Sequence, residues 1–148
     1  MVERYRGGVL PAAGELQKID QDLLARAERL PESLADVYSR LELQQCAMLP
    51  VELARAANAY IDATEPFKLA KDAAKSGRLD TVLNTATVAI HHCLIGLLPI
   101  LRQKSSEGLA QLGVETSGRT LEELYSNPPK AGAKLGPGQP LFPNVVPE

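Results

Sequence analysis

Along most of the chain, apolar residues recur at steps of three and four positions, and this helical period constrains the fold more than any other feature. It predicts helices at about 20–41, 43–63, 81–98 and 101–112, and no segment with the two-residue period of a strand stands out. Apolar residues make up 45% of the sequence, which is enough for a core. We therefore expect an all-α fold, an antiparallel bundle of about four main helices.

Prolines, glycines and capping residues set the expected boundaries of these helices. Gly7 and Gly8 end a short helix at Val2–Arg6, so residues 1–7 are interpreted as a truncated first helix. Asp20 and Asp80 are expected to be N-caps of the helices that follow them, with residues 75–78 forming a loop before the second. Pro31 predicts a kink or a break in the helix that contains it.

The end of the chain has a different composition from the rest. Residues 128–148 hold six of the eleven prolines and three glycines, which excludes a regular helix. The segment is either a free tail or an extended arm on the bundle, and its apolar anchors favour the arm: Leu141, Phe142, Val145 and Val146. We expect the whole chain, residues 1–148, to form one helical domain that ends in this irregular, Pro/Gly-rich arm.

Charge and composition exclude several classes of protein. The 16 Lys and Arg residues against 18 Asp and Glu residues give a net charge of −2, unlike the strongly basic proteins that bind nucleic acid autonomously. The longest apolar run, residues 86–101, is shorter than the roughly 20 residues that span a membrane. The first residues of the sequence lack the apolar region typical of a signal peptide, and Cys46 and Cys93 fall in helical patterns typical of core thiols. We expect a cytoplasmic protein without membrane contact.

No catalytic motif and no metal-ligand spacing is present, so we expect no catalytic and no metal-binding residues. The adjacent His91 and His92 point about 100 degrees apart on a helix, which predicts one ring in the core and one at the surface. A small enzyme built on this pair is an alternative that lacks a nucleophile.

One segment combines an aromatic residue with several cations. Phe67 follows Pro66 at an expected helix start, and four basic residues lie close to it: Lys68, Lys71, Lys75 and Arg78. A ring can stack on an unpaired base while the cations neutralise phosphates, which indicates RNA binding. The alternative, favoured on the residues alone, is that Phe67 fills the core and the lysines are solvated.

The segment at 57–71, Ala-Asn-Ala-Tyr-Ile-Asp-Ala-Thr-Glu-Pro-Phe-Lys-Leu-Ala-Lys, resembles a signature of the class I aminoacyl-tRNA synthetases of the methionyl type. That family has an Ala-Asn-x-Tyr-Ile-Asp motif and then a Pro-Trp-x-Leu-Ala-Lys turn. Weaker similarities in the same order extend over nearly the whole chain, at 6–11, 97–99, 109–113 and 141–143. The resemblance implies the C-terminal anticodon-binding bundle of a methionyl-tRNA synthetase, without the catalytic domain.

Several expectations follow from that resemblance. Phe67 takes the place of the family's Trp and stacks on an anticodon base, Pro66 fixes its backbone, and Lys68, Lys71, Lys75 and Arg78 contact phosphates. The partners are a methionine tRNA and the catalytic domain of the parent protein, which binds the ATP and methionine, so this chain itself needs no cofactor. We expect Asn58, Tyr60 and Ile61 mainly to pack within the bundle and to hold the turn at Pro66 and Phe67 in place. The alternative function is a helical protein–protein interaction module, and the truncated first helix favours self-association.

Overall fold

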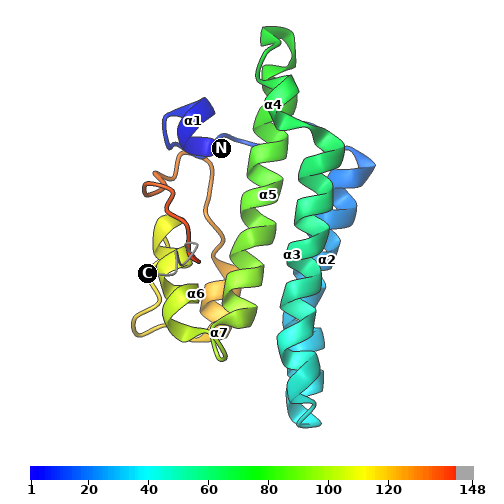
Figure 1. Ribbon diagram of the computed structural model, residues 1–148, viewed down its shortest axis with the longest axis vertical. Helices are drawn as coiled ribbons and strands as arrows, with labels where there is room; N and C mark the ends of the chain where they lie inside the picture. Colours follow the sequence, from blue (N-terminus) through cyan, green and yellow to red (C-terminus); the bar gives the residue numbers. More distant parts are fainter. Residues whose placement is uncertain (143–148) are drawn as a thin grey trace, which may run out of the picture.

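The computed structural model describes residues 1–142, and these form a helical bundle (Figure 1). The elements in chain order are α1 (Val2–Arg6), α2 (Lys18–Ser39), α3 (Leu43–Thr64), α4 (Pro66–Leu69), the 3₁₀ turn η1 (Ala73–Lys75), α5 (Ser76–Leu97), α6 (Arg102–Gln111) and α7 (Leu121–Ser126). The all-α prediction is confirmed. Within the described residues, extended pairing is limited to one isolated antiparallel bridge between Val9 and Lys134.

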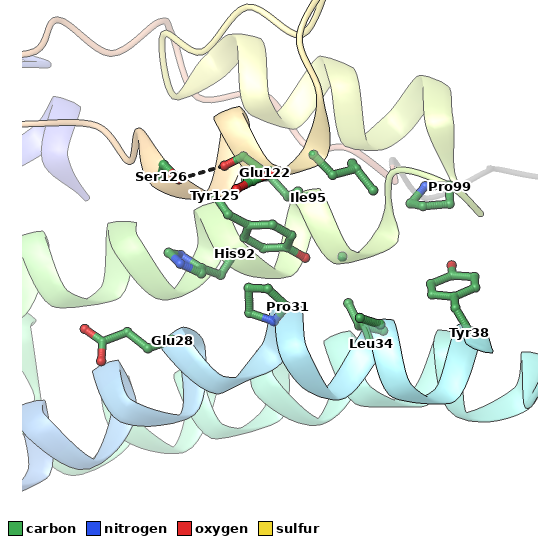
Figure 2. A pocket seen from close by; sticks show the side chains of 13 residues that line it. Glu28, Pro31, Leu34, Tyr38, His92, Ile95, Pro99, Glu122, Tyr125 and Ser126 are labelled. Atoms are coloured by element: carbon green, nitrogen blue, oxygen red, sulfur yellow. Dashed lines mark hydrogen bonds between the residues drawn. The ribbon is translucent and has the colours of Figure 1, made fainter. Parts of the chain in front are cut away.

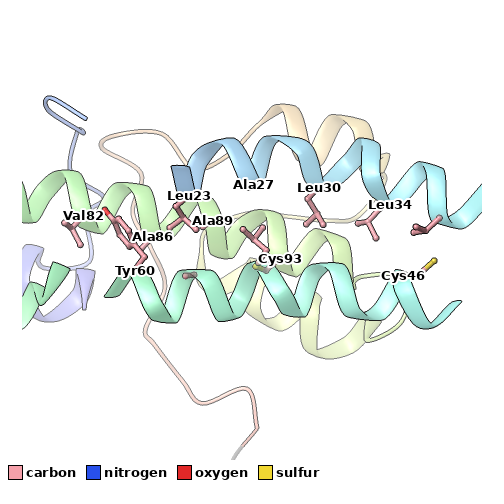
Figure 3. Close-up of a cluster of buried hydrophobic side chains, with 13 residues drawn as sticks. Leu23, Ala27, Leu30, Leu34, Cys46, Tyr60, Val82, Ala86, Ala89 and Cys93 are labelled. Atoms are coloured by element: carbon pink, nitrogen blue, oxygen red, sulfur yellow. The ribbon is translucent and has the colours of Figure 1, made fainter. Parts of the chain in front are cut away.

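The main core lies between the three long helices α2, α3 and α5, which run side by side in Figure 1 and pack against one another. Their apolar stripes meet along the length of the bundle (Figure 3). Both cysteines are buried there with free thiols, as their helical positions predicted. The buried side chains of this core are Leu23, Ala27, Leu30, Leu34, Val37, Cys46, Leu53, Ala57, Tyr60, Val82, Ala86, Ala89 and Cys93.

A second, smaller core covers another side of α5. Ile95 of α5 packs there with Leu109 of α6, Val114 and Leu124 of α7. Because α5 is enclosed by α2 and α3 on one side and by α6 and α7 on another, its second half is buried nearly all round. His91 is 0% exposed and His92 only 6%. The prediction that one of these rings lies at the surface is therefore wrong.

The C-terminal segment is a docked arm as far as residue 142. It pairs with the segment after α1: the Leu10 amide donates to the Ala133 carbonyl (2.9 Å), and the Gly132 amide donates to the Leu10 carbonyl (2.8 Å). Farther along, the Gly136 amide donates to the Gln111 carbonyl at the end of α6 (2.8 Å). The predicted anchors Val145 and Val146, and Pro143 of the Leu-Phe-Pro motif, lie outside the described residues.

Two predicted helix starts are wrong. The N-cap of α2 is Gln17, and Asp20 lies one turn further in, where its carboxylate accepts from the Gln17 amide (2.7 Å). Residues 75–78 are not a loop, because the Asp72 carboxylate accepts from the Ala74 amide and starts η1, which runs directly into α5. Asp80 therefore lies inside α5 and forms an ion pair with Arg6.

The prolines inside the long helices do not interrupt them. Helix α2 continues through Pro31 and α3 continues through Pro50, so the break considered at Pro31 does not occur. None of the helices in residues 1–142 is both long enough and apolar enough to span a membrane.

Candidate nucleic-acid interface

The turn between α3 and α4 presents an aromatic ring to water at one end of the bundle, the top in Figure 1. Helix α3 ends at Glu65, which has a left-handed conformation (φ 46°, ψ 56°) and turns the chain sharply. Pro66 follows at the first position of α4, where it needs no amide donor, and its side chain is buried. Phe67 is 49% exposed. The alternative in which Phe67 fills the core is therefore wrong.

The lysines near this ring lie at the surface with weak local partners. Lys68 Nζ is 2.7 Å from a Glu65 carboxylate oxygen, and Lys75 Nζ is 3.5 Å from one of Asp72. Lys71 is exposed and forms no ion pair within residues 1–142. Exposed pairs of this kind contribute about 1 kcal/mol or less, so a phosphate can replace the carboxylates at low cost.

Arg78 differs from the lysines because its side chain is held against the bundle. Its two terminal nitrogens donate to the two oxygens of Asp20, at 2.5 and 2.9 Å. The Asp20 side chain is 0% exposed and that of Arg78 is 19% exposed. While this pair is intact, those nitrogens are not available to a phosphate, which is at odds with the phosphate contact predicted for Arg78.

The same carboxylate also accepts a hydrogen bond from the Tyr60 hydroxyl (2.5 Å). Burial by itself raises the pKa of the Asp20 carboxyl, but the hydrogen bonds from Arg78 and Tyr60 outweigh it and hold that pKa below its ordinary value. Burial and the hydrogen bond to Asp20 raise the pKa of the Tyr60 phenol. Asp20 is thus an ionised, buried group, which the sequence pattern showed only as a helix cap.

The residues assigned to packing divide into two kinds. Tyr60 is buried and Ile61 half-buried, as predicted, and the Tyr60 carbonyl accepts from the Thr64 hydroxyl (2.7 Å) just before the turn. Asn58 is exposed, so its packing role is not confirmed. A helix with its apolar stripe at 53, 57, 60 and 61 places position 58 on the opposite face.

A cavity of about 540 Å³ lies away from this turn, between α2, α5 and α7 (Figure 2). Tyr125 lies beside His92, with ring centroids 5.4 Å apart. His92 Nδ1 is hydrogen-bonded to the Val88 carbonyl (2.9 Å), and burial lowers the pKa of this histidine. No group of three or more potential metal ligands occurs in the described part of the chain.

The curated proteins to which the chain is similar include several methionine–tRNA ligases. The chain is 33% identical over 145 residues to the methionine–tRNA ligase of Caldanaerobacter subterraneus subsp. tengcongensis, covering 98% of this chain and 23% of that protein. It is 32% identical over 148 residues to that of Deinococcus radiodurans, covering 100% of this chain and 22% of the relative. The chain thus spans less than a quarter of the length of these relatives. A search of family models finds no match.

The fold has a counterpart among solved structures. The crystal structure of the apo form of Mycobacterium tuberculosis methionyl-tRNA synthetase matches with a TM-score of 0.91 at 22% identity, over 100% of this chain and 30% of that one. The same protein with methionyl-adenylate matches with a TM-score of 0.86 over 97% of this chain. The described residues therefore have the fold of a part of a larger protein.

Proposed function

This chain is homologous over its whole length to one segment of the methionyl-tRNA synthetases, and from that relationship we propose that it is a tRNA-binding module that recognises the anticodon of a methionine tRNA. The observation that carries the proposal is the position of Phe67, half exposed on a turn at one end of the bundle. The proposed module recognises RNA and does not make or break a covalent bond.

In this mechanism the Phe67 ring stacks on an unpaired anticodon base. Pro66 restricts the backbone before it, so little conformational entropy is lost when the base binds. Lys68 in α4, Lys71 just after α4 and Lys75 in η1 neutralise phosphates of the anticodon loop. Stacking on one aromatic ring contributes about 1–3 kcal/mol per base, so this ring accounts for a large share of the affinity.

The module serves the ligation of methionine to tRNA only together with a catalytic domain. The relatives named methionine–tRNA ligase are about four times as long as this chain, which covers 22–23% of them. We assign the binding of ATP and methionine to that other part. The partners proposed for this chain are accordingly a methionine tRNA and the catalytic domain of the same enzyme.

The test is a binding titration of the 148-residue chain with the anticodon stem–loop of a methionine tRNA. The change Phe67→Ala should weaken binding by about 5- to 150-fold, which corresponds to the loss of one stacked base. Phe142→Ala is the matched control, because it removes the chain's other phenylalanine ring, which is also exposed (69%) but lies on the C-terminal arm, and it should leave the affinity unchanged. Equal affinities for wild type and Phe67→Ala contradict the proposal.

A second candidate function, a helical module that docks on another protein, is favoured by the net charge of −2. The dependence of binding on salt separates the two. Phosphate contacts release counterions, so RNA binding weakens steeply as salt rises, whereas docking through apolar groups changes little. A flat salt profile for the stem–loop favours the docking module.

A further inference from the structure

One buried carboxylate connects the ends of the three long helices. Asp20 is in the first turn of α2, Tyr60 is in the last turns of α3, and Arg78 is in the first turn of α5. The Tyr60 hydroxyl and both terminal nitrogens of Arg78 donate to Asp20, at 2.5, 2.5 and 2.9 Å. With the Gln17 amide, the carboxylate accepts four hydrogen bonds and is wholly shielded from water.

The two donors bracket the segment that carries the exposed ring. Seventeen residues separate Tyr60 from Arg78, and they include the turn at Glu65, the helix α4 and η1. Both ends of this segment are attached to the same side chain of α2. Between those ends, α4 and η1 lie against α5. The orientation of Phe67 at the outer surface thus depends on how α3 and α5 are spaced at this end of the bundle.

We propose that Asp20 and Arg78 are positioning residues for RNA recognition: their ion pair fixes the spacing of α3 and α5, and thereby the orientation in which Phe67 meets an anticodon base. The affinity part of this inference rests on the proposed function. It also replaces the expectation that Arg78 itself binds a phosphate.

The energetics oppose a direct phosphate contact by Arg78. If its guanidinium moved to a phosphate, Asp20 would remain as a buried, ionised carboxylate without its counter-charge. An unpaired buried charge is strongly destabilising, whereas the exposed Lys68 and Lys71 bind a phosphate without that penalty. The two parallel hydrogen bonds from Arg78 to Asp20 fix both the distance between the two side chains and their relative orientation. A single contact from an ammonium group fixes the distance alone.

The first experiment is a double-mutant cycle on stem–loop binding by the full chain. Arg78→Lys keeps the charge but loses the bidentate contact, and it should weaken binding about fivefold or more when Phe67 is present and by less than about twofold in the Phe67→Ala background. The dependence on salt should not change. Arg40→Lys is the control: Arg40 also pairs with carboxylates, those of Asp36 and Glu42, but at the α2–α3 turn and outside the segment between Tyr60 and Arg78, so the affinity should be retained.

A direct phosphate contact gives a different pattern. In that case Arg78→Lys or Arg78→Gln weakens binding equally with and without Phe67, and Arg78→Gln lowers the salt slope by about 1, which overturns the proposal. Unchanged affinity in a folded Arg78→Lys protein overturns it as well.

The second experiment needs no RNA. The chain has two phenylalanines, so fluorophenylalanine labelling gives one ¹⁹F resonance for Phe67 and an internal reference from Phe142. Arg78→Lys should shift or broaden the Phe67 resonance alone, and Arg40→Lys should leave both unchanged. If the wild type does not bind the stem–loop but this shift is seen, the positioning of Phe67 stands and the proposed function fails. An unshifted Phe67 resonance overturns the positioning role whatever the RNA result.

Discussion

The ring of Pro50 in α3 packs directly against Gly96 in α5. A β-carbon at position 96 would lie 2.9 Å from Pro50 Cγ and 3.1 Å from a methyl group of Leu34 in α2. A proline inside a helix favours a kink or a break, yet α3 is continuous at Pro50. This proline and this glycine allow the three long helices to approach one another closely at one point.

The change Gly96→Ala should lower the free energy of unfolding by about 1–3 kcal/mol, because the added methyl group meets a rigid ring and overpacks the core. The loss should occur even though alanine favours a helix over glycine by about 1 kcal/mol. Urea denaturation measures it. Gly77→Ala in the same helix is the control: nothing lies within 4 Å of a β-carbon there, so its stability should stay the same or rise. Equal effects at the two positions contradict the close contact.

The buried His91 should make the protein sensitive to mild acid. Burial and the neighbouring His92 lower the pKa of His91 from 6.5 to about 4. The unfolded chain therefore takes up a proton near pH 6.5, whereas the folded chain does so only near pH 4, and acid favours unfolding in between. His91 alone should reduce the free energy of unfolding by about 2 kcal/mol between pH 7 and pH 5. Urea denaturation at the two pH values tests this.

The variant His91→Leu is the control for the pH experiment. Leucine has a similar volume and does not titrate, so the difference in stability between pH 7 and pH 5 should shrink by about 2 kcal/mol. The part due to His92, whose pKa is also lowered, should remain. The lowered pKa of Asp20 adds a further loss only at more acidic pH, where the unfolded chain's carboxyl takes up a proton that the folded Asp20 does not yet bind. An unchanged pH dependence in His91→Leu would rule out this residue as its source.

Leu41, in the turn between α2 and α3, has a left-handed conformation (φ 58°) and is 80% exposed. A side chain with a β-carbon is strained there, and little packing offsets the strain. We expect Leu41→Gly to raise the free energy of unfolding by about 0.5–1 kcal/mol, measured as a higher midpoint in thermal denaturation. Leu43→Gly is matched in exposure (69%) but lies within α3, so it should be neutral or destabilising.

Features set by neighbouring residues could be predicted from the sequence. The end of α3 before Pro66, the short helix after it and the capping box of Thr120 and Glu123 depend on local rules, and the structure has all three. The exposure of Phe67 was not predictable from the residues alone, because an aromatic residue after a proline fits a core as well as a surface.

Features set by distant residues could not be predicted. Arg78 is a cation among lysines in the sequence, and its partner Asp20 lies 58 positions away. His92 falls off the expected apolar stripe of its helix, and it is buried only because α7 covers that side, with Tyr125 against its ring. The spacing of apolar residues in a helix predicts the apolar stripe of that helix, but it does not predict how many other helices pack around it.

The pairing of residues 8–10 with residues 132–135 also determines the order of events during synthesis. Leu10 is made before both hydrogen-bond partners of its backbone, Gly132 and Ala133, which follow more than a hundred residues later. The long helices can associate in the meantime, since their contacts are complete by residue 97. The pairing of residues 8–10 therefore forms after the long helices are made, and a nascent chain that stops before position 132 leaves the backbone of Leu10 unpaired.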